Sequence, residues 1–492
     1  MRPNSSLFFI LLTTICAIHA SEESVLSSDP DYLATCNTIE ASVSNASAVF
    51  YPRSTQYAQD ISHYFQSSSR NSTCAVEPGT AEDVAIILRI VGQTRTPFAV
   101  KSGGHASNPG FSSTPGVQIT TKRFDSIQYD ATSQTVSLGT GLIWDDVYAA
   151  FDSLGINCLG GRVVGIGVAG FILGGGYSWQ TNQHGLAVDT VVEFEVVLPG
   201  GDIVTATDSS YPDLFFALKG GSNNLGIVTK VVMRAFPQGP IWGGLIFLSS
   251  EQYGSVVDAT ANFAATVTDP KAVVLPSFLY TAGMLASSVI LFYDGPTPPP
   301  GVFEQFLAIP ALSSDISTRS FLSFFRTLVS PAHRGVLDTV PVVDYSPVML
   351  DAMVNETIFW SHALQDYSLS TLLYSVEPFL PSILSHNTSP SAYPPRRDVV
   401  YLPTSITFGW TDPSQDSLFI DSIMQTYRTL RIKAAAEGQP VTPAEGYAKY
   451  GNYAIASTPL EQIYGDNLPE LQRIKRTYDP DNVMGLTGGW KF

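Results

Sequence analysis

The stretch VKSGGHAS at residues 100–107 constrains this chain more than any other part of its sequence. It follows a short hydrophobic strand pattern at residues 97–101, so its two glycines stand where a strand ends. Glycines at such a point leave backbone N–H groups exposed in a concave loop, which can bind a phosphate or pyrophosphate. His105 then stands at the rim of the loop. The alternative interpretation is a tight turn in which the imidazole is merely hydrogen bonded.

A second glycine cluster at residues 160–176 contains the pattern GxGxxG at residues 165–170, with Asp189 further along the chain. That arrangement is typical of a Rossmann dinucleotide site, in which the glycine loop opens a helix. Here residues 174–176 are also glycines and would fall early in that helix, where each costs about 1 kcal/mol relative to alanine. We therefore interpret the cluster as backbone that lies flat against a planar ligand.

Residues 1–20 have the layout of a secretory signal peptide, with Arg2, an apolar core at residues 7–18 and the small residue Ala20. No later apolar run is long enough to span a membrane, so we expect an exported protein without a membrane partner. A formal net charge of -17 argues against nucleic-acid partners, which are held largely by lysine and arginine. Four sequons fit glycosylation of an exported chain: Asn45-Ala46-Ser47, Asn71-Ser72-Thr73, Asn355-Glu356-Thr357 and Asn387-Thr388-Ser389.

Cys36, Cys74 and Cys158 are the cysteines outside the signal segment, too few for a disulfide scaffold. An oxidising compartment permits a bridge between Cys36 and Cys74, which would leave Cys158 as a buried free thiol. No HExxH pattern or close histidine pair with acidic ligands occurs in the sequence, so we expect no metal site. GxSxG and P-loop patterns are absent as well, which argues against the commonest hydrolases and nucleoside triphosphatases.

Periodicity predicts several elements before and after the glycine clusters. Thr80 caps a helix with Glu82 and Asp83 in its first turn, and a second helix starts at Trp144 and is closed by Gly155. Strands are predicted at residues 116–121 and 135–141, and two more at residues 186–206 around a turn at 199–202. Residues 240–440 alternate strand patterns with amphipathic stretches, which is typical of an α+β region.

The Gly-His loop, the second glycine cluster and the stretch YGDNLPELQRIKRTYDPDN at residues 464–482 together resemble the FAD-linked oxidases of the vanillyl-alcohol-oxidase type. Within that group the chain is similar to the berberine-bridge-enzyme-like branch. The resemblance implies an α+β fold, in which a two-part PCMH-type FAD-binding domain carries an inserted substrate domain with an antiparallel sheet. The implied boundaries are a signal peptide at 1–20, a cap segment at 21–77, the FAD-binding domain at 78–236, the substrate domain at 237–440 and a returning segment at 441–492.

The resemblance also implies FAD bonded covalently to His105, the match of the family's attachment histidine. Some relatives add a second bond through a cysteine ahead of the triple glycine, and Val163 falls there, so we expect a single attachment. Cys158 stands five residues before Val163, so it does not match the position of the second attachment cysteine. The residues expected to bind the cofactor are Ser102, Gly103, Gly104, His105, Ala106, Gly167, Gly170, Gly174, Gly175, Gly226, Ile227, Val228 and Asn452.

Tyr450 and Tyr453 match the family's closing segment, which faces the flavin ring. We take Tyr450 as the first candidate for the catalytic base and Tyr453 as the second, because a buried tyrosine can accept a proton when its neighbours lower its pKa. The alternative is that both are core or ring-packing aromatics. Ile166 falls where relatives carry a residue that guards the approach of oxygen. His184 is expected to be a structural partner.

The resemblance implies a function. We expect a secreted FAD oxidase that abstracts a hydride from a small secondary-metabolite alcohol, phenol or amine, with O2 as acceptor and H2O2 as by-product. An oligosaccharide oxidase or a flavin dehydrogenase of the same fold are the alternatives. From another class, a catalytically silent secreted binding protein would keep the fold without turnover. The expected partners are a small-molecule substrate and O2, and we expect a monomer.

Overall fold

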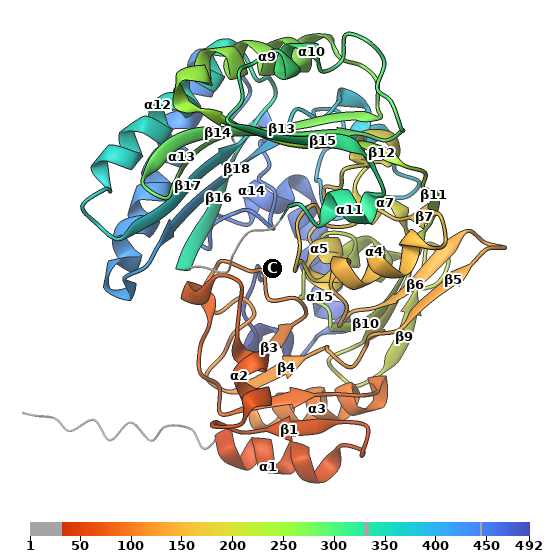
Figure 1. The fold of residues 1–492 in the computed structure, drawn as a ribbon. Helices are drawn as coiled ribbons and strands as arrows, with labels where there is room; N and C mark the ends of the chain where they lie inside the picture. The colour runs from red at the N-terminus through yellow and green to blue at the C-terminus, as the bar shows by residue number, and fades with distance from the viewer. Residues whose placement is uncertain (1–31, 329–333, 443–444) are drawn as a thin grey trace, which may run out of the picture. The chain divides into compact units, whose positions relative to one another are not determined.

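The N-terminal part of the chain builds a four-stranded sheet, and two helices that contact each other lie beside it (Figure 1). In order across the sheet its strands are β1 (Ala48–Phe50), β2 (Cys74–Glu77), β4 (Val117–Thr120) and β3 (Phe98–Lys101). The strands β2, β4 and β3 are parallel, and the helices are α1 (Tyr32–Ser42) and α3 (Ala81–Thr94). The Thr80 side chain caps α3 by accepting a hydrogen bond from the Asp83 N–H, as predicted. The computed structural model describes residues 32–328, 334–442 and 445–492, so the predicted signal segment lies outside the described residues.

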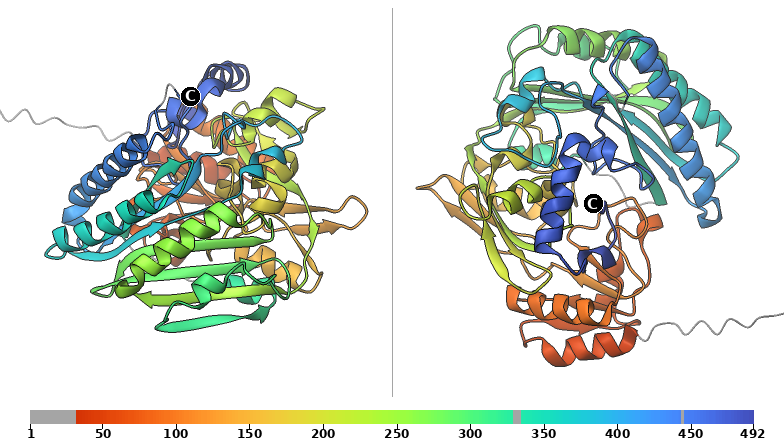
Figure 2. Two further views of the ribbon diagram at one scale, coloured as in Figure 1. Left: turned by 90° about the horizontal axis from the view of Figure 1, so that it is seen from above. Right: turned by 180° about the vertical axis from the view of Figure 1, so that it is seen from behind.

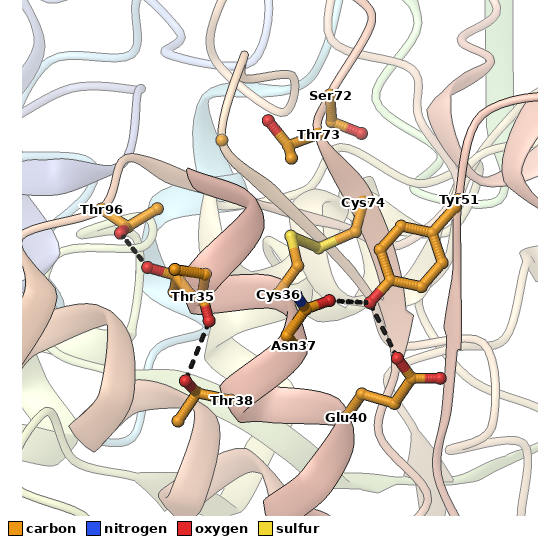
Figure 3. The surroundings of a disulfide bond; sticks show 12 residues. Thr35, Cys36, Asn37, Thr38, Glu40, Tyr51, Ser72, Thr73, Cys74 and Thr96 are labelled. Carbon is orange, nitrogen blue, oxygen red and sulfur yellow. Dashed lines mark hydrogen bonds between the residues drawn. A yellow bond between two sulfur atoms is a disulfide. The ribbon is translucent and has the colours of Figure 1, made fainter. Parts of the chain in front are cut away.

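A disulfide between Cys36 and Cys74 connects α1 to β2 (Figure 3). It joins residues 38 positions apart, and both cysteines are buried. Cys158 is a buried free cysteine, as the sequence suggested. Because β1 and β2 share a sheet with β3 and β4, the described part of the predicted cap segment contributes two strands to the N-terminal sheet.

A five-stranded antiparallel sheet follows. Its strands are β5 (Ile127–Asp130), β6 (Thr135–Gly139), β10 (Ile227–Arg234), β8 (Val191–Val197) and β9 (Ile203–Ala206), in that order across the sheet. The predicted turn at residues 199–202 joins β8 to β9, and the Leu198 N–H donates to the Asp202 carbonyl across it. The predicted helix is α4 (Trp144–Asp152), but its C-cap is Ser153. Gly155 has a φ of 64° in the turn beyond and does not close the helix, which corrects that prediction.

One further prediction is wrong in part. Residues 160–176 do not form a continuous flat ribbon, because Gly167 caps a six-residue helix, α5 (Val168–Leu173). The helix ends at Gly174, and Gly175 and Gly176 both have positive φ values of 118° and 82°. The glycines at 174–176 therefore terminate the helix, so the cost expected for glycines inside it does not arise.

The third large unit is a seven-stranded antiparallel sheet, hereafter the roof sheet. Its strands, in order, are β15 (Ser313–Arg319), β12 (Ile241–Ser249), β14 (Met284–Tyr293), β13 (Ala272–Thr281), β17 (Leu369–Ser375), β18 (Leu402–Trp410) and β16 (Arg334–Val342). Helices cover its outer face in Figure 1, namely α9 (Tyr253–Thr266), α12 (Pro347–Ala363) and α13 (Asp416–Ala436). This sheet confirms the predicted antiparallel α+β region.

The last part of the chain packs back on elements of its first half through α15 (Leu468–Tyr478) (Figure 2, right). The Lys475 side chain donates to the Asn224 carbonyl, and the Asn224 side chain donates to the Trp490 carbonyl at 2.6 Å. Met484 packs in the core beneath the N-terminal sheet. No helix in the described residues is long and apolar enough to cross a membrane.

Candidate active site

The loop after β3 carries the predicted anion-binding backbone. Among the residues that the structure describes, none accepts a hydrogen bond from the N–H groups of residues 102–106, so five successive donors are left for a ligand. Gly104 has a φ of 74°, a value that favours glycine. The Ser102 hydroxyl donates to the Thr140 carbonyl at 2.7 Å, and the Thr140 hydroxyl donates to the Val228 carbonyl at 2.9 Å. Thr140 thus connects the loop to the start of β10.

The loop lies directly against the second glycine cluster. A Cβ atom added to Gly103 would lie 2.3 Å from the Gly167 nitrogen, and one added to Gly167 would lie 2.2 Å from the Gly103 nitrogen. Both positions therefore need glycine, because no side chain fits between two backbones this close. A Cβ atom on Gly165 would lie 3.0 Å from His105 Nε2. The two glycine segments that the sequence singled out are one structural unit.

His105 is held in this unit with its ring packed on two sides. Its imidazole stacks on the Tyr64 ring at 4.3 Å between centroids and 12° between planes, and Nε2 faces Gly165. Burial lowers the pKa of His105 to about 4, so the imidazole is neutral at neutral pH. Neither ring nitrogen hydrogen bonds to a residue in the described part of the chain. A neutral imidazole of this kind has a lone pair available for bonding.

The closing segment meets α5 through Asn452. Its side-chain amide donates to the Gly170 carbonyl at 3.2 Å and to the Phe171 carbonyl at 3.3 Å. A Cβ atom on Gly174 would lie 2.1 Å from Asn452 Oδ1, so glycine is needed there too. By contrast, a Cβ atom on Gly170 would meet no atom within 4 Å. Gly170 and Asn452 are both exposed, which leaves open space beside the glycine unit.

Tyr450 is buried beside this contact. Its hydroxyl oxygen accepts hydrogen bonds from the Gly176 N–H at 3.2 Å and from the Asn452 amide at 3.0 Å. The ring of Tyr177 lies 4.9 Å away in an edge-to-face arrangement. Burial raises the pKa of Tyr450 to about 12, so the phenol stays protonated at neutral pH. Gly175 belongs to the same contact, since its Cβ atom would lie 3.5 Å from the Tyr450 ring.

Tyr453 belongs to a buried cluster that sequence reasoning missed. The Tyr453 hydroxyl donates to Glu377 Oε1 at 3.0 Å, and Arg162 Nη2 donates to Glu377 Oε2 and to the Tyr453 oxygen, both at 2.7 Å. The Arg162 and Glu377 side chains are 8% and 1% exposed. Burial raises the pKa of Glu377, while the charge and hydrogen bond of Arg162 and the Tyr453 hydrogen bond oppose that rise.

Glu377 follows β17 of the roof sheet, and its N–H donates to the Tyr345 hydroxyl at 3.2 Å. Arg162 stands three positions before Gly165, which packs on His105. The cluster therefore connects the roof sheet, the glycine unit and the closing segment. The guanidinium also lies over two aromatic rings, at 5.5 Å from Phe379 and 6.0 Å from Trp179. No local sequence pattern marks Glu377, because its partners are brought to it by tertiary structure alone.

The remaining predicted residues lie as follows. Gly226 has a φ of 148°, and Ile227 and Val228 begin β10 with buried side chains, so their contribution to cofactor binding stays a prediction that only their backbone could fulfil. Ala106 belongs to the loop with the five unpartnered N–H groups. His184 stacks on Phe236 at 3.7 Å.

The surroundings of Val163 and Cys158 bear on the prediction of a single covalent attachment. Val163 is half-buried in the glycine unit, where a side chain without sulfur cannot form a bond to the flavin. Cys158 is completely buried, and burial raises the pKa of its thiol far above the usual range. Within the described residues, no group of three His, Cys, Asp or Glu side chains is placed to hold a metal ion.

The residues present fit FAD. Unpartnered N–H groups at the Gly-His loop suit the anionic pyrophosphate, and the open space beside Gly170 suits a ring system that lies against backbone. The neutral imidazole of His105 stands at the same unit. A flavin bound there would have the closing segment with Tyr450 and Tyr453 as its neighbour.

Comparison with known proteins identifies the family. The FAD binding domain family matches residues 72–207, and the berberine and berberine-like family matches residues 449–487. An FAD-linked oxidoreductase of Arthroderma benhamiae, described as uncharacterized, is 33% identical over 77% of this chain and 78% of its own. The FAD-dependent monooxygenase prx3 of Penicillium roqueforti is 29% identical over 97% of both chains. Wild-type BBE-like 1 of Physcomitrella patens has the same fold, with a TM-score of 0.73 and 18% identity over 91% of this chain and 97% of its own. The chain therefore belongs to the berberine-bridge-enzyme-like family of FAD-dependent oxidoreductases.

Proposed function

We propose that this protein is an oxidase that removes a hydride from a small secondary-metabolite alcohol, phenol or amine, with O2 as the electron acceptor and H2O2 as the by-product. The observation that carries the proposal is the buried Tyr453, Glu377 and Arg162 cluster beside the flavin-binding glycine unit. When bound, FAD supplies the hydride acceptor. The side chains of this chain then have to orient the substrate and move one proton.

Tyr453 is the group best placed to take that proton. Burial raises the pKa of Tyr453 well above its ordinary value, so its hydroxyl cannot remain ionised and wait for a proton. It can accept one only if its own proton leaves at the same time, and Glu377 Oε1 at 3.0 Å is the acceptor. Arg162 opposes the rise that burial causes in the pKa of Glu377, and its guanidinium also donates to the Tyr453 oxygen, so its positive charge lies where negative charge develops.

Tyr450 is less suited to the same role, although the sequence ranked it first. Its hydroxyl oxygen accepts two hydrogen bonds, and none of the described residues accepts a proton from it. The Gly176 N–H and the Asn452 amide instead hold the phenol in a fixed orientation against the glycine turn. We assign Tyr450 to the packing of the closing segment and Tyr453 to proton transfer.

We further propose a single covalent attachment of FAD through His105. Support comes from its neutral, stacked imidazole, which has no hydrogen-bond partner in the described chain. Val163 cannot form a second bond, and the thiol of Cys158 is a weak nucleophile because burial keeps it protonated. Attachment prevents loss of the cofactor from an exported protein.

Export is supported by two kinds of structural feature. The disulfide between Cys36 and Cys74 suits an oxidising compartment. Three of the sequon asparagines, Asn45, Asn71 and Asn355, are exposed, and Asn387 is half-buried. We propose secretion after removal of residues 1–20, with glycosylation at these sites.

The test compares wild type with His105→Ala, Tyr453→Phe and Tyr450→Phe. Flavin should stay with the acid-precipitated wild type and wash out of His105→Ala, as measured by absorbance of pellet and supernatant. A peroxide screen over alcohols, phenols, amines and oligosaccharides then identifies the substrate. With it, Tyr453→Phe should lower the anaerobic rate of flavin reduction about 10²- to 10⁴-fold, and Tyr450→Phe much less.

Three results would contradict the proposal in different ways. A colourless wild-type protein would indicate a silent binding protein. Equal losses in the two tyrosine variants would remove the special role of Tyr453. Turnover in which an oxygen atom from O2 appears in the product, detected by mass spectrometry with labelled O2, would indicate a monooxygenase like the activity named for the Penicillium roqueforti relative.

A further inference from the structure

We propose that Tyr64 is the positioning residue that orients the His105 imidazole for its bond to the flavin. This inference rests on the covalent attachment in the proposed function and names a residue that determines how readily attachment occurs. Tyr64 lies far from the glycine motifs in sequence, between α2 (Thr55–Ile61) and the short helix η1 (Gln66–Ser68), and no motif marks it.

The contact between the two rings fixes the plane of the imidazole. The centroids of Tyr64 and His105 lie 4.3 Å apart, and the planes differ by 12°. Gly165 borders the Nε2 edge, where its Cβ atom would come within 3.0 Å. With one face on a phenol ring and one edge on backbone, the ring has little freedom to rotate about its bond to Cβ. The lone pair of the other nitrogen, Nδ1, is therefore held in one direction.

Tyr64 is itself anchored to the loop that it supports. Its N–H donates to the Gly104 carbonyl at 3.0 Å, one residue before His105. The Phe65 ring meets the Tyr64 ring edge-to-face at 4.9 Å and 87°. Tyr64 is half-buried, whereas Phe65 is 5% exposed. The two aromatic residues thus differ in their relation to His105, because the Tyr64 ring stacks on the imidazole while the Phe65 ring supports Tyr64 from the side.

Lys101 extends the same support to the backbone before Tyr64. Its ammonium group donates to the carbonyls of Gln59, Asp60 and Ser62, at 2.9, 2.8 and 2.7 Å. These carbonyls lie at the C-terminal end of α2, where helix carbonyls lack partners and favour a cation. Lys101 is the last residue of β3, immediately before the Gly-His loop. One side chain therefore ties the loop to the segment that carries Tyr64.

Orientation matters because the attachment bond needs in-line approach of a nitrogen lone pair to a carbon atom. A C–N bond between Nδ1 and the ring methyl carbon replaces one C–H and one N–H bond, so two protons and two electrons are released. The electrons enter the flavin, and O2, the acceptor in the proposed function, takes them and the two protons to form H2O2. A freely rotating imidazole would point its lone pair correctly for a small share of the time, which slows this step.

The test uses full-length Tyr64→Leu, Tyr64→Phe and, as the matched control, Phe65→Leu. Each protein is produced under riboflavin limitation and then given FAD, and the covalent share is followed over time as flavin fluorescence of the denatured polypeptide. Non-covalent flavin is measured in the supernatant, and the thermal midpoint reports folding. We expect attachment about tenfold slower in Tyr64→Leu, with FAD still bound, and close to the wild-type rate in Tyr64→Phe and Phe65→Leu.

The outcomes separate this inference from the proposed function. Wild-type protein without covalent flavin would overturn the attachment through His105, and this inference with it. Normal attachment in wild type and in Tyr64→Leu would overturn the role of Tyr64 alone. An equal loss in Phe65→Leu would also overturn it, because general loosening of the segment would then explain the effect. If Tyr64→Leu does not fold, Tyr64→Met replaces it, and normal attachment there would overturn the role equally.

Discussion

Replacing Arg162 with methionine should destabilise the protein strongly and in a pH-dependent way. Methionine keeps much of the length of the side chain but removes the charge that pairs with Glu377. The pair has a 2.7 Å contact, and its side chains are 8% and 1% exposed, so solvent cannot compensate Glu377 once its partner is gone. Removing one partner of a buried ion pair typically costs about 3–5 kcal/mol.

The pH dependence follows from the proton on Glu377. Burial already raises its pKa, and the variant lacks the arginine that opposes this rise. The folded variant therefore keeps the proton at pH values where the unfolded chain, with a glutamate pKa near about 4.3, has released it. Its free energy of unfolding falls as pH rises above about 4.3 and levels off above the raised pKa. The destabilisation by Arg162→Met is thus smaller at pH 5 than at pH 8.

Urea unfolding of the flavin-loaded proteins at the two pH values tests this reasoning. Glu377→Gln in the Arg162→Met background should recover much of the lost stability at pH 8, because the buried charge is then absent. Arg473→Met is the control, since Arg473 pairs with Glu470 on the surface, with side chains 52% and 50% exposed, and this variant should unfold close to wild type at both pH values. An Arg162→Met protein within about 1 kcal/mol of wild type at pH 8, or one equally destabilised at both pH values, would refute the reasoning.

Three further predictions concern the disulfide, the glycine unit and the attachment of flavin. Cys36→Ser opens a disulfide that closes a separation of 38 residues and should cost about 4 kcal/mol by loop entropy; an unchanged thermal midpoint would contradict this. Gly174→Ala places a Cβ atom 2.1 Å from Asn452 Oδ1 and should cost about 1–3 kcal/mol in urea unfolding, while the control Gly170→Ala, with open space, should cost less than about 1 kcal/mol. Flavin attachment should be constant from pH 8 to 6 and decline toward pH 4, as His105 becomes protonated; a decline near pH 6.5 would mean an ordinary histidine.

Local sequence signals predicted the parts of the site that depend on backbone. Gly103 and His105 stand in one short motif, and the residue types themselves indicate the backbone conformation that the motif adopts. The cap of α3 and the turn between β8 and β9 were predicted for the same reason. The short helix α5 was missed because glycines on either side of it obscured six residues of ordinary helical character.

Contacts made by distant side chains could not be predicted in this way. Arg162 and Glu377 are 215 positions apart, and only the tertiary arrangement of the roof sheet places the end of β17 beside the glycine unit. Tyr64 stacks on His105 through packing of an irregular segment with no pattern of its own. Between Tyr450 and Tyr453, which stand three positions apart in the closing segment, only the tertiary partners of each hydroxyl make a distinction.

The return of the closing segment has a consequence for how this enzyme is made in the cell. Asn108 donates to the Ala454 carbonyl and accepts from the Ala456 N–H, both at 2.9 Å, so the Gly-His loop is secured by residues synthesised long after it. A nascent chain on the ribosome has His105 early but no Asn452 or Tyr453 until synthesis is nearly finished. Messages truncated before this segment should therefore yield polypeptides that lack part of the place for the cofactor.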